Sequence, residues 1–329
     1  MTSLLTPSSI GIAVGAVGAV TLLLLLRRRS RRQRLPSTSG DKTPKKGAAG
    51  HAGNMESGGF FYKLEVANRF ENERAFLEQL RVTSDPMSKC TPEFHGVATM
   101  EGKRYIKMRS LIEGFDMDSI CQMDVKMGVR YFAEKELDST KPRPDLFEKL
   151  LQIGLPLTRS LLTAEELGAK AITKARWMTI RDATSSTKEL GFRVDGVVTP
   201  VRRRTPFGDL ATCRTDGQVV DALRSFLPAS RPRACCETVL RRLGEIESSL
   251  RRSELFFQSE VIGSSLLFAA DKNGKVGVWL LDFGLTCAAE VPGGCLRHDR
   301  PWKLGNHEDG YLTGLTNLQR LWRRVLAEL

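Results

Sequence analysis

The sequence predicts an α+β fold with a small lobe first and a larger lobe second, preceded by one N-terminal transmembrane helix. Three observations predict it: an unbroken apolar run over residues 10–26, a strand–helix–hairpin pattern over residues 60–112, and a second hairpin followed by an apolar-striped helix at residues 318–329. With 329 residues, 41% of them hydrophobic, the chain is long enough to bury a sizeable core.

The apolar run at residues 10–26 has the length of a short membrane span, and six arginines follow it within residues 27–34. No charge precedes the run, so the positive-inside rule places the remainder of the chain in the cytosol. The alternative, a cleaved signal peptide, would need a basic start and a small-residue cleavage site, and the sequence has neither. We therefore expect a short tail at 1–9, a membrane anchor at 10–26 and a basic, flexible linker at 27–58. The endoplasmic reticulum and the mitochondrial outer membrane both fit a short anchor.

The charge and the cysteines exclude several classes of protein. The first 50 residues carry nine Lys and Arg against the single acid Asp41, so they hold +8 of the net +12 and leave +4 for the rest. The basic pI therefore arises mainly from the basic segment over the first 50 residues, and we expect no nucleic-acid partner. Seven cysteines without a C-x-x-C pair and four scattered histidines predict neither a zinc site nor a disulfide scaffold, which fits a reducing compartment.

The small lobe is predicted over residues 59–113. Residues 60–66 have the pattern of a strand, and residues 68–81 that of a helix with apolar residues on one face. Residues 97–100 and 104–112 flank a Glu-Gly-Lys turn, which predicts a hairpin.

The larger lobe is predicted over residues 114–329. It contains a strong hairpin signal, two helical patterns and a polar stretch that we interpret as a loop. In chain order these are the loop at 199–236, a helix at 237–250, hairpin strands at 265–270 and 276–282, and a helix at 318–329.

Two short motifs fit phosphoryl transfer, which needs carboxylates for a metal ion and cations along the phosphates. Asp282-Phe283-Gly284 directly follows an apolar strand, where a carboxylate can project into a cleft; the alternative is an Asp that caps a turn. Asp124 and Lys126 lie two residues apart in an extended segment and so point to the same side; the alternative is an exposed ion pair that stabilises little.

Other basic residues are weaker candidates. Lys63 lies in the first strand among apolar residues and has the position of a phosphate-binding lysine, or of a solvated strand lysine. Lys174, Arg181 and Arg193 surround the polar cluster at 185–187 and could bind several phosphates. Taken alone, that pattern favours a solvated basic face.

Six ordered blocks of sequence together resemble the inositol polyphosphate kinases, and within them the inositol-trisphosphate 3-kinases. The blocks are D-V-K-M-G-V-R-Y-F-A-E-K-E-L at 124–137, T-S-S-T-K-E-L-G-F-R at 184–193, V-I-G-S-S-L-L-F at 261–268, D-F-G at 282–284, H-D-R-P-W at 298–302 and N-H-E-D-G-Y-L-T-G-L at 306–315. The resemblance covers residues 51–329. It implies a two-lobed, protein-kinase-like fold with a helical insert at about 137–177 that closes over an inositol phosphate.

The resemblance also implies an activity and a site. ATP and Mg²⁺ would serve to phosphorylate inositol 1,4,5-trisphosphate at its 3-hydroxyl, giving the 1,3,4,5-tetrakisphosphate. Lys126 would be the central catalytic residue, meeting acceptor and transferred phosphate, and Asp282 would hold magnesium. The nucleotide would be bound by Lys63, Arg109, Ser110, Leu111, Asp124, Ser265 and Asp282, and the acceptor phosphates by Lys126, Arg143, Lys149, Lys174 and Arg181.

The sequence departs from the family pattern at three positions. Ser110 stands where the hinge usually has an acidic residue, and Leu285 and Val198 stand where lysines are usual. The arginines at 202–204 are close enough in sequence to compensate for Val198. The loss of these lysines favours a weaker affinity for the substrate or a shifted substrate preference. It keeps a broader-specificity inositol polyphosphate kinase as the first alternative.

Two further alternatives concern partners. A membrane-tethered pseudokinase or adaptor is disfavoured, because the sequence retains both the nucleotide-binding and the metal-binding residues. Calmodulin binding is common among relatives, and the segment 147–162 is its candidate site, although that segment is only moderately basic and contains Pro156.

Overall fold

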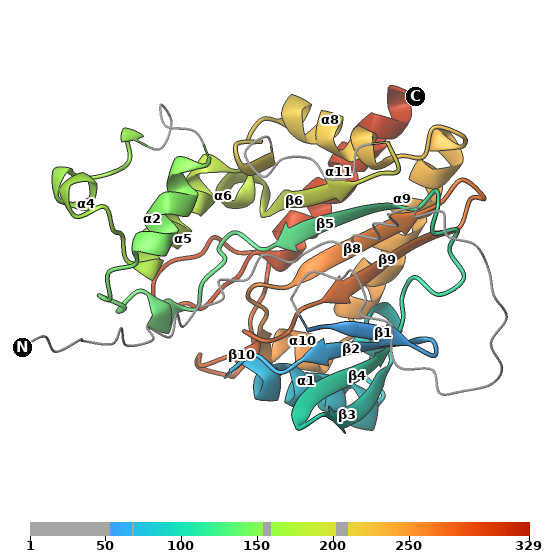
Figure 1. Cartoon of the computed structure of the whole chain (residues 1–329), viewed down its shortest axis with the longest axis horizontal. Helices are drawn as coiled ribbons and strands as arrows, with labels where there is room; N and C mark the ends of the chain where they lie inside the picture. The colour runs from blue at the N-terminus through green and yellow to red at the C-terminus, as the bar shows by residue number, and fades with distance from the viewer. Residues whose placement is uncertain (1–52, 68, 154–158, 202–209) are drawn as a thin grey trace, which may run out of the picture.

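The computed structural model describes residues 53–67, 69–153, 159–201 and 210–329. Two four-stranded antiparallel sheets form the centres of a small and a larger lobe (Figure 1), which confirms the α+β prediction. No helix within the described ranges is long and apolar enough to cross a membrane. The predicted anchor at 10–26 lies outside these ranges.

The small lobe has the strand order β1-β2-β4-β3, with one long helix beside the sheet. Glu101 and Gly102 both have positive φ, the conformation that a tight hairpin between β3 and β4 requires. Its elements are β1 (Met55–Ser57), β2 (Phe60–Leu64), α1 (Arg69–Thr83), the 3₁₀ helix η1 (Pro86–Cys90), β3 (Phe94–Met100) and β4 (Lys103–Arg109).

The larger lobe has the strand order β6-β5-β8-β9, and three helices cover one face of this sheet. Its strands are β5 (Cys121–Met127), β6 (Phe192–Val198), β7 (Ser259–Glu260), β8 (Ser265–Ala270), β9 (Val276–Leu281) and β10 (Cys287–Ala288), and its helices are α8 (Asp216–Phe226), α9 (Pro232–Leu250), α10 (Glu254–Phe257) and α11 (Tyr311–Ala327).

Between β5 and β6 the chain forms short helices that gather at one end of the sheet (Figure 1). They have a hydrophobic core of their own, in which Phe147, Leu150, Ile172 and Trp177 are buried. The elements are the 3₁₀ helix η2 (Glu134–Glu136), α2 (Pro144–Leu151), α4 (Ala164–Ala169), α5 (Lys174–Thr184) and α6 (Thr187–Leu190). The candidate calmodulin segment begins in α2, and two of its apolar side chains, Phe147 and Leu150, are already used in this core.

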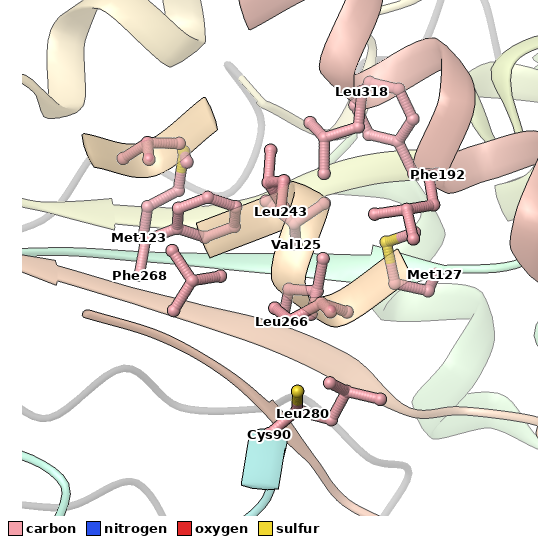
Figure 2. Packing of buried hydrophobic residues seen from close by; sticks show 14 of the residues in the cluster. Cys90, Met123, Val125, Met127, Phe192, Leu243, Leu266, Phe268, Leu280 and Leu318 are labelled. Atoms are coloured by element: carbon pink, nitrogen blue, oxygen red, sulfur yellow. The ribbon is translucent and has the colours of Figure 1, made fainter. Parts of the chain in front are cut away.

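The main core lies between the larger sheet and its helices. Met123, Val125 and Met127 of β5 point into it, where Leu243 of α9 and Leu318 of α11 meet them (Figure 2). Because side chains alternate along a strand, the residues between these three point to the opposite face of the sheet. The packing of β5 therefore determines which way Asp124 and Lys126 face.

The prediction of a loop over residues 199–236 is wrong, because α8 and the first turns of α9 lie within it. Thr215 begins α8 with a capping box, accepting from the backbone N–H of Gln218. The helix buries residues 219, 220, 223 and 226 at helical spacing. This short apolar stripe is hidden in the sequence among charged neighbours, so composition alone indicates a loop.

Candidate functional site

Strand β5 supplies two charged residues that are almost completely buried. Lys126 is 2% exposed and Asp124 is 0% exposed, and Lys126 Nζ lies 4.0 Å from Asp124 Oδ2. Neither carboxylate oxygen of Asp124 accepts a hydrogen bond from the described residues. The alternative of an exposed ion pair is thus excluded, and a buried carboxylate that accepts no hydrogen bond is a group that a ligand would satisfy.

The small lobe contributes Lys63, which joins the two lobes. Its Nζ lies 2.7 Å from Glu73 Oε2 of α1 and 2.7 Å from Asp282 Oδ1, just beyond β9. Lys126 Nζ approaches the other oxygen of the same carboxylate, Asp282 Oδ2, at 3.4 Å. Asp282 is therefore shared by one lysine from each lobe. With Asp124 and with Ser265, which is paired with Lys126 across β5 and β8, the structure brings together five of the residues that the resemblance implies.

Asp282 also has an unusual backbone. Its φ is +67°, in the left-handed region that costs a residue other than glycine roughly 1–3 kcal/mol. The strain directs its carboxylate between Lys63 and Lys126, and its side chain keeps 27% of its surface exposed. Strained residues of this kind concentrate at functional sites.

The pKa values of the charged residues in this cluster are strongly shifted. Burial disfavours the charge on Asp282, but Lys63 and Lys126 together hold the pKa of Asp282 well below its ordinary value. Burial also opposes the charge on Lys126, and the carboxylates of Asp124 and Asp282 nevertheless raise its pKa. Burial raises the pKa of Asp124 to about 7, against the opposing effect of Lys126. The site thus holds two ammonium groups that stay protonated around one carboxylate that stays ionised.

The donor set is compatible with a divalent cation held partly by a nucleotide. No group of three or more His, Cys, Asp or Glu side chains is arranged for a metal in the part of the chain that the structure describes. Magnesium commonly takes one or two carboxylates and completes its shell with phosphate oxygens and water. The partly exposed Asp282 and the buried Asp124, whose carboxylate accepts no hydrogen bond, fit that requirement.

The segment that joins β4 to β5 is held at both ends. Ser110 N donates to Gly59 O at 2.9 Å, and its hydroxyl is hydrogen-bonded to Glu56. Farther along, Lys275 Nζ donates to Glu113 O at 2.7 Å. Arg109 directs its side chain toward Phe60, with its guanidinium carbon 5.0 Å from the ring centroid. Adenine contacts by Arg109, Ser110 and Leu111 stay a prediction.

The basic residues predicted to bind acceptor phosphates are distributed over the helical insert. Lys174 begins α5 and is paired with Glu136, Arg143 lies before α2 with its Nη2 2.6 Å from Asp145, and Lys149 is exposed on α2. Arg181 is buried, and its Nη1 donates to Ala211 O at 2.9 Å. Their role in substrate binding stays a prediction, and residues 202–204 lie outside the described ranges.

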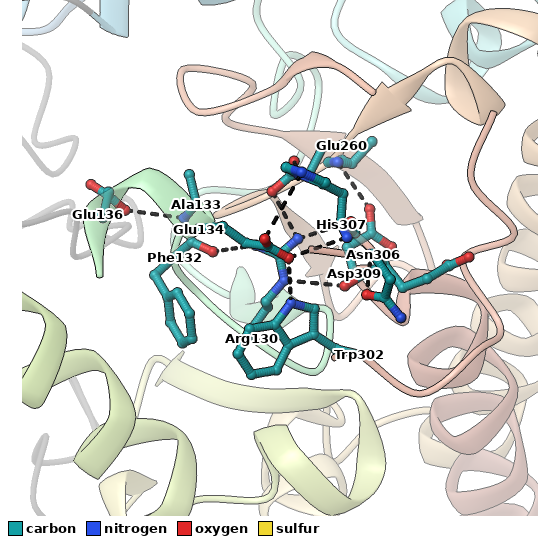
Figure 3. Close-up of polar contacts among 12 residues, drawn as sticks. Arg130, Phe132, Ala133, Glu134, Glu136, Glu260, Trp302, Asn306, His307 and Asp309 are labelled. Atoms are coloured by element: carbon teal, nitrogen blue, oxygen red, sulfur yellow. Dashed lines mark hydrogen bonds and ion pairs between the residues drawn. The ribbon is translucent and has the colours of Figure 1, made fainter. Parts of the chain in front are cut away.

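A network of hydrogen bonds and ion pairs holds the segment that follows β5 (Figure 3). Arg130 is 1% exposed, and its Nη2 donates to Glu260 Oε1 at 2.7 Å and to His307 O at 2.9 Å. Glu134 accepts hydrogen bonds from Trp302 Nε1 at 2.8 Å and from the backbone of residues 305 and 307. These contacts fix the segment that connects Lys126 to the helical insert.

His298 and Asp309 form a buried pair in the same region. His298 Nδ1 lies 2.8 Å from Asp309 Oδ1, its Nε2 lies 3.0 Å from Phe256 O, and its ring stacks on Phe256 with centroids 3.9 Å apart. Burial opposes protonation, but Asp309 raises the pKa of His298 above its ordinary value.

We expect this pair to make stability depend on pH. Because the folded-state pKa is raised, the contribution of His298 is fully present below the unfolded-state pKa of 6.5 and is lost as pH rises through the folded-state pKa. Urea unfolding of the wild type and of His298→Gln between about pH 6 and about pH 9 measures this directly. The difference in the free energy of unfolding should shrink as pH rises, and a constant difference would contradict the prediction.

Sequence reasoning missed two charged residues of the site. Glu73 is the partner of Lys63, and its signal was a lone carboxylate on the otherwise apolar face of α1 formed by Phe70 and Leu77. Asp195 lies at a β-bulge in β6, where Gly196 pairs with Asp124 but Val194 pairs with Val125. The isolated glycine inside this strand, Gly196, was the sequence signal for the bulge.

Comparisons with known proteins agree with this geometry. The sequence model described as inositol polyphosphate kinase matches residues 105–323. Inositol-trisphosphate 3-kinase A of Homo sapiens is 38% identical over 271 residues, covering 82% of this chain and 56% of that protein. The homolog of Caenorhabditis elegans is 33% identical over 266 residues, covering 79% of this chain and 50% of that protein. The chain thus spans about half the length of these relatives.

A solved structure shows the same fold. The inositol phosphate multikinase of S. cerevisiae, crystallised with ADP and Mn²⁺, superposes with a TM-score of 0.51 at 17% sequence identity, covering 82% of this chain and 100% of that one. The family model, the curated relatives and the shared fold lead to one conclusion. The chain belongs to the inositol polyphosphate kinase family.

Proposed function

We propose that the chain transfers the γ-phosphoryl group of ATP to inositol 1,4,5-trisphosphate at its 3-hydroxyl. One observation carries the proposal: lysines from both lobes converge on Asp282 at 2.7 Å and 3.4 Å, beside a buried Asp124 whose carboxylate accepts no hydrogen bond. Phosphoryl transfer demands this combination of cations and carboxylates in one place. The names of the relatives, inositol-trisphosphate 3-kinases, support the choice of acceptor.

The residues of the site would divide the work as follows. Lys63 would bind the ATP phosphates from the small lobe, with Glu73 holding its ammonium group in place. Lys126 would bind the transferred phosphoryl group, and its fixed charge would stabilise the transition state without reorganisation. Asp282 and Asp124 would hold Mg²⁺, which when bound neutralises charge on the phosphate oxygens. Catalysis would then consist of positioning and charge neutralisation, with no general base assigned.

Assay of the full chain in detergent with Mg²⁺-ATP and radiolabelled trisphosphate tests the proposal. The expected product is the tetrakisphosphate, identified against a standard by chromatography. ATP binding without a product from any inositol phosphate would favour the adaptor alternative. Product from several inositol phosphates at similar kcat/KM would favour a broader-specificity kinase.

Leu285 gives the alternative of a broader-specificity kinase a structural basis. It directly follows the Asp282-Phe283-Gly284 motif, and a side chain at Gly263 would come within 3.1 Å of it, so it lies close to the start of β8. A leucine there supplies no charge to an acceptor phosphate. We expect Leu285→Lys to lower the KM for the trisphosphate about tenfold, since a charge-assisted hydrogen bond contributes about 1.5–3 kcal/mol. An unchanged KM, measured at saturating ATP, would show that the lost lysine is of no consequence for this acceptor.

We also propose that residues 10–26 anchor the chain in a membrane with its catalytic part in the cytosol. The apolar run and the arginines after it support the proposal. Alkaline carbonate extraction of membranes from cells that express the full chain provides the test. Recovery of the chain in the membrane pellet is expected, and its release into the supernatant would contradict the proposal.

A further inference from the structure

Arg193 lies on β6 directly beside Lys126. The two residues are paired across the antiparallel strands β5 and β6, so their side chains emerge on the same face of the sheet about 5 Å apart at Cβ. The ring of Tyr131 contacts both cations: its centroid is 4.8 Å from the guanidinium carbon of Arg193 and 5.7 Å from Lys126 Nζ. Arg193 therefore belongs to the same side of the site as the lysine that would meet the acceptor.

The guanidinium of Arg193 is fixed on one side only. Its Nε donates to Asp195 Oδ1 at 3.2 Å, and its Nη1 donates to Thr187 Oγ1 at 3.1 Å and lies 3.5 Å from Asp182 Oδ1. Arg193 and Asp195 lie two residues apart on β6, so the alternation of side chains along the strand places them on the same face of the sheet.

The remaining nitrogen, Nη2, donates no hydrogen bond to a described residue, although Arg193 is only 5% exposed. A pre-oriented guanidinium with one N–H pair that makes no hydrogen bond to the described residues is a donor suited to a phosphate oxygen.

We propose that Arg193 is a further acceptor-binding residue, which donates from Nη2 to a phosphate of the inositol phosphate on a ring carbon near the reacting hydroxyl. The assignment rests on the proposed function. Asp195, Thr187 and Tyr131 are its positioning residues. Lys126 would meet the reacting group, and Arg193, one strand away, would select acceptors that carry a phosphate next to it.

The test is a comparison of acceptors that differ by one phosphate. The kcat/KM is measured for the trisphosphate and for the three bisphosphates that each lack one of its phosphates, with the wild type, Arg193→Met, Arg193→Lys and the control Arg214→Met. Arg214 is an exposed arginine paired with Glu189. For the trisphosphate, Arg193→Met should reduce kcat/KM about ten- to a hundredfold, with the KM for ATP unchanged within about twofold. For the bisphosphate that lacks the bound phosphate, the same substitution should cost little further.

A purely structural role predicts a different pattern. All four acceptors would then lose kcat/KM in parallel, and that result overturns the assignment. Arg193→Lys keeps a cation against Asp195 and Asp182 should Arg193→Met fail to fold, and it is expected to lose selectivity in the same direction.

Failure of the proposed function would look different again, because the wild type would show no turnover with any inositol phosphate. Calorimetric binding of the trisphosphate to the wild type and to Arg193→Lys would then decide the assignment of Arg193. Equal affinities would overturn it, and weaker binding by the variant would support it.

Discussion

Replacing Lys126 with methionine is expected to reduce phosphoryl transfer about a thousandfold, the loss that follows removal of a pre-oriented charge from a transition state. Methionine retains most of the volume of the lysine side chain, so the buried space that Lys126 occupies on its own face of β5 stays filled. The carboxylates of Asp124 and Asp282 would lose their shared cation, and Asp124, whose pKa is already raised to about 7, would take up a proton more readily. The measurement is single-turnover transfer from labelled ATP to the trisphosphate, which isolates the chemical step from product release.

Lys188→Met is the matched control for this experiment. Lys188 is exposed on α6, a few residues before β6, and is outside the charge cluster. Its variant should keep wild-type turnover. Thermal unfolding of both variants shows whether either has lost the fold. A Lys126→Met protein that is folded and transfers phosphate within about tenfold of the wild-type rate would contradict the role given to Lys126.

The parts of the fold that the sequence predicts well are those with local signals. The hairpin of β8 and β9 is one: Asp271 Oδ1 accepts from the backbone of Asn273 and Lys275 and so closes the turn within five residues. The period-two alternation of β5 is another, since it separates Asp124 and Lys126 from the apolar residues between them. These signals are local and can be recognised without knowledge of the tertiary structure.

The remainder of the site depends on tertiary placement. Glu73 becomes the partner of Lys63 only because α1 packs beside the small sheet, and Arg193 reaches the cluster only through the pairing of β5 with β6. Sequence reasoning alone assigned the basic residues around 185–187 to a solvated face. The structure buries Arg181 and Arg193 among carboxylates, where their charge is compensated. Long-range pairing of this kind cannot be derived from composition or spacing.

Asp282→Asn is expected to separate nucleotide binding from its dependence on magnesium. Asparagine tolerates positive φ as readily as aspartate, so the strained backbone at this position should persist. The variant loses the carboxylate that Lys63 and Lys126 share, and both ammonium groups become available to ATP phosphates. Calorimetry should therefore show that ATP without metal binds the variant at least as tightly as it binds the wild type.

The same substitution removes the main candidate ligand for the metal. The increase in ATP affinity on adding Mg²⁺ should be abolished, and turnover at saturating Mg²⁺-ATP should fall about a thousandfold. Asp221→Asn, at an aspartate on α8 whose side chain is 75% exposed, serves as the control and should behave as the wild type. If Mg²⁺ strengthened ATP binding to Asp282→Asn as much as it does in the wild type, the metal would have to be held elsewhere. Asp124, the other proposed ligand, would then be the main one, because its buried oxygens accept no hydrogen bond and need a ligand to compensate for the loss of water.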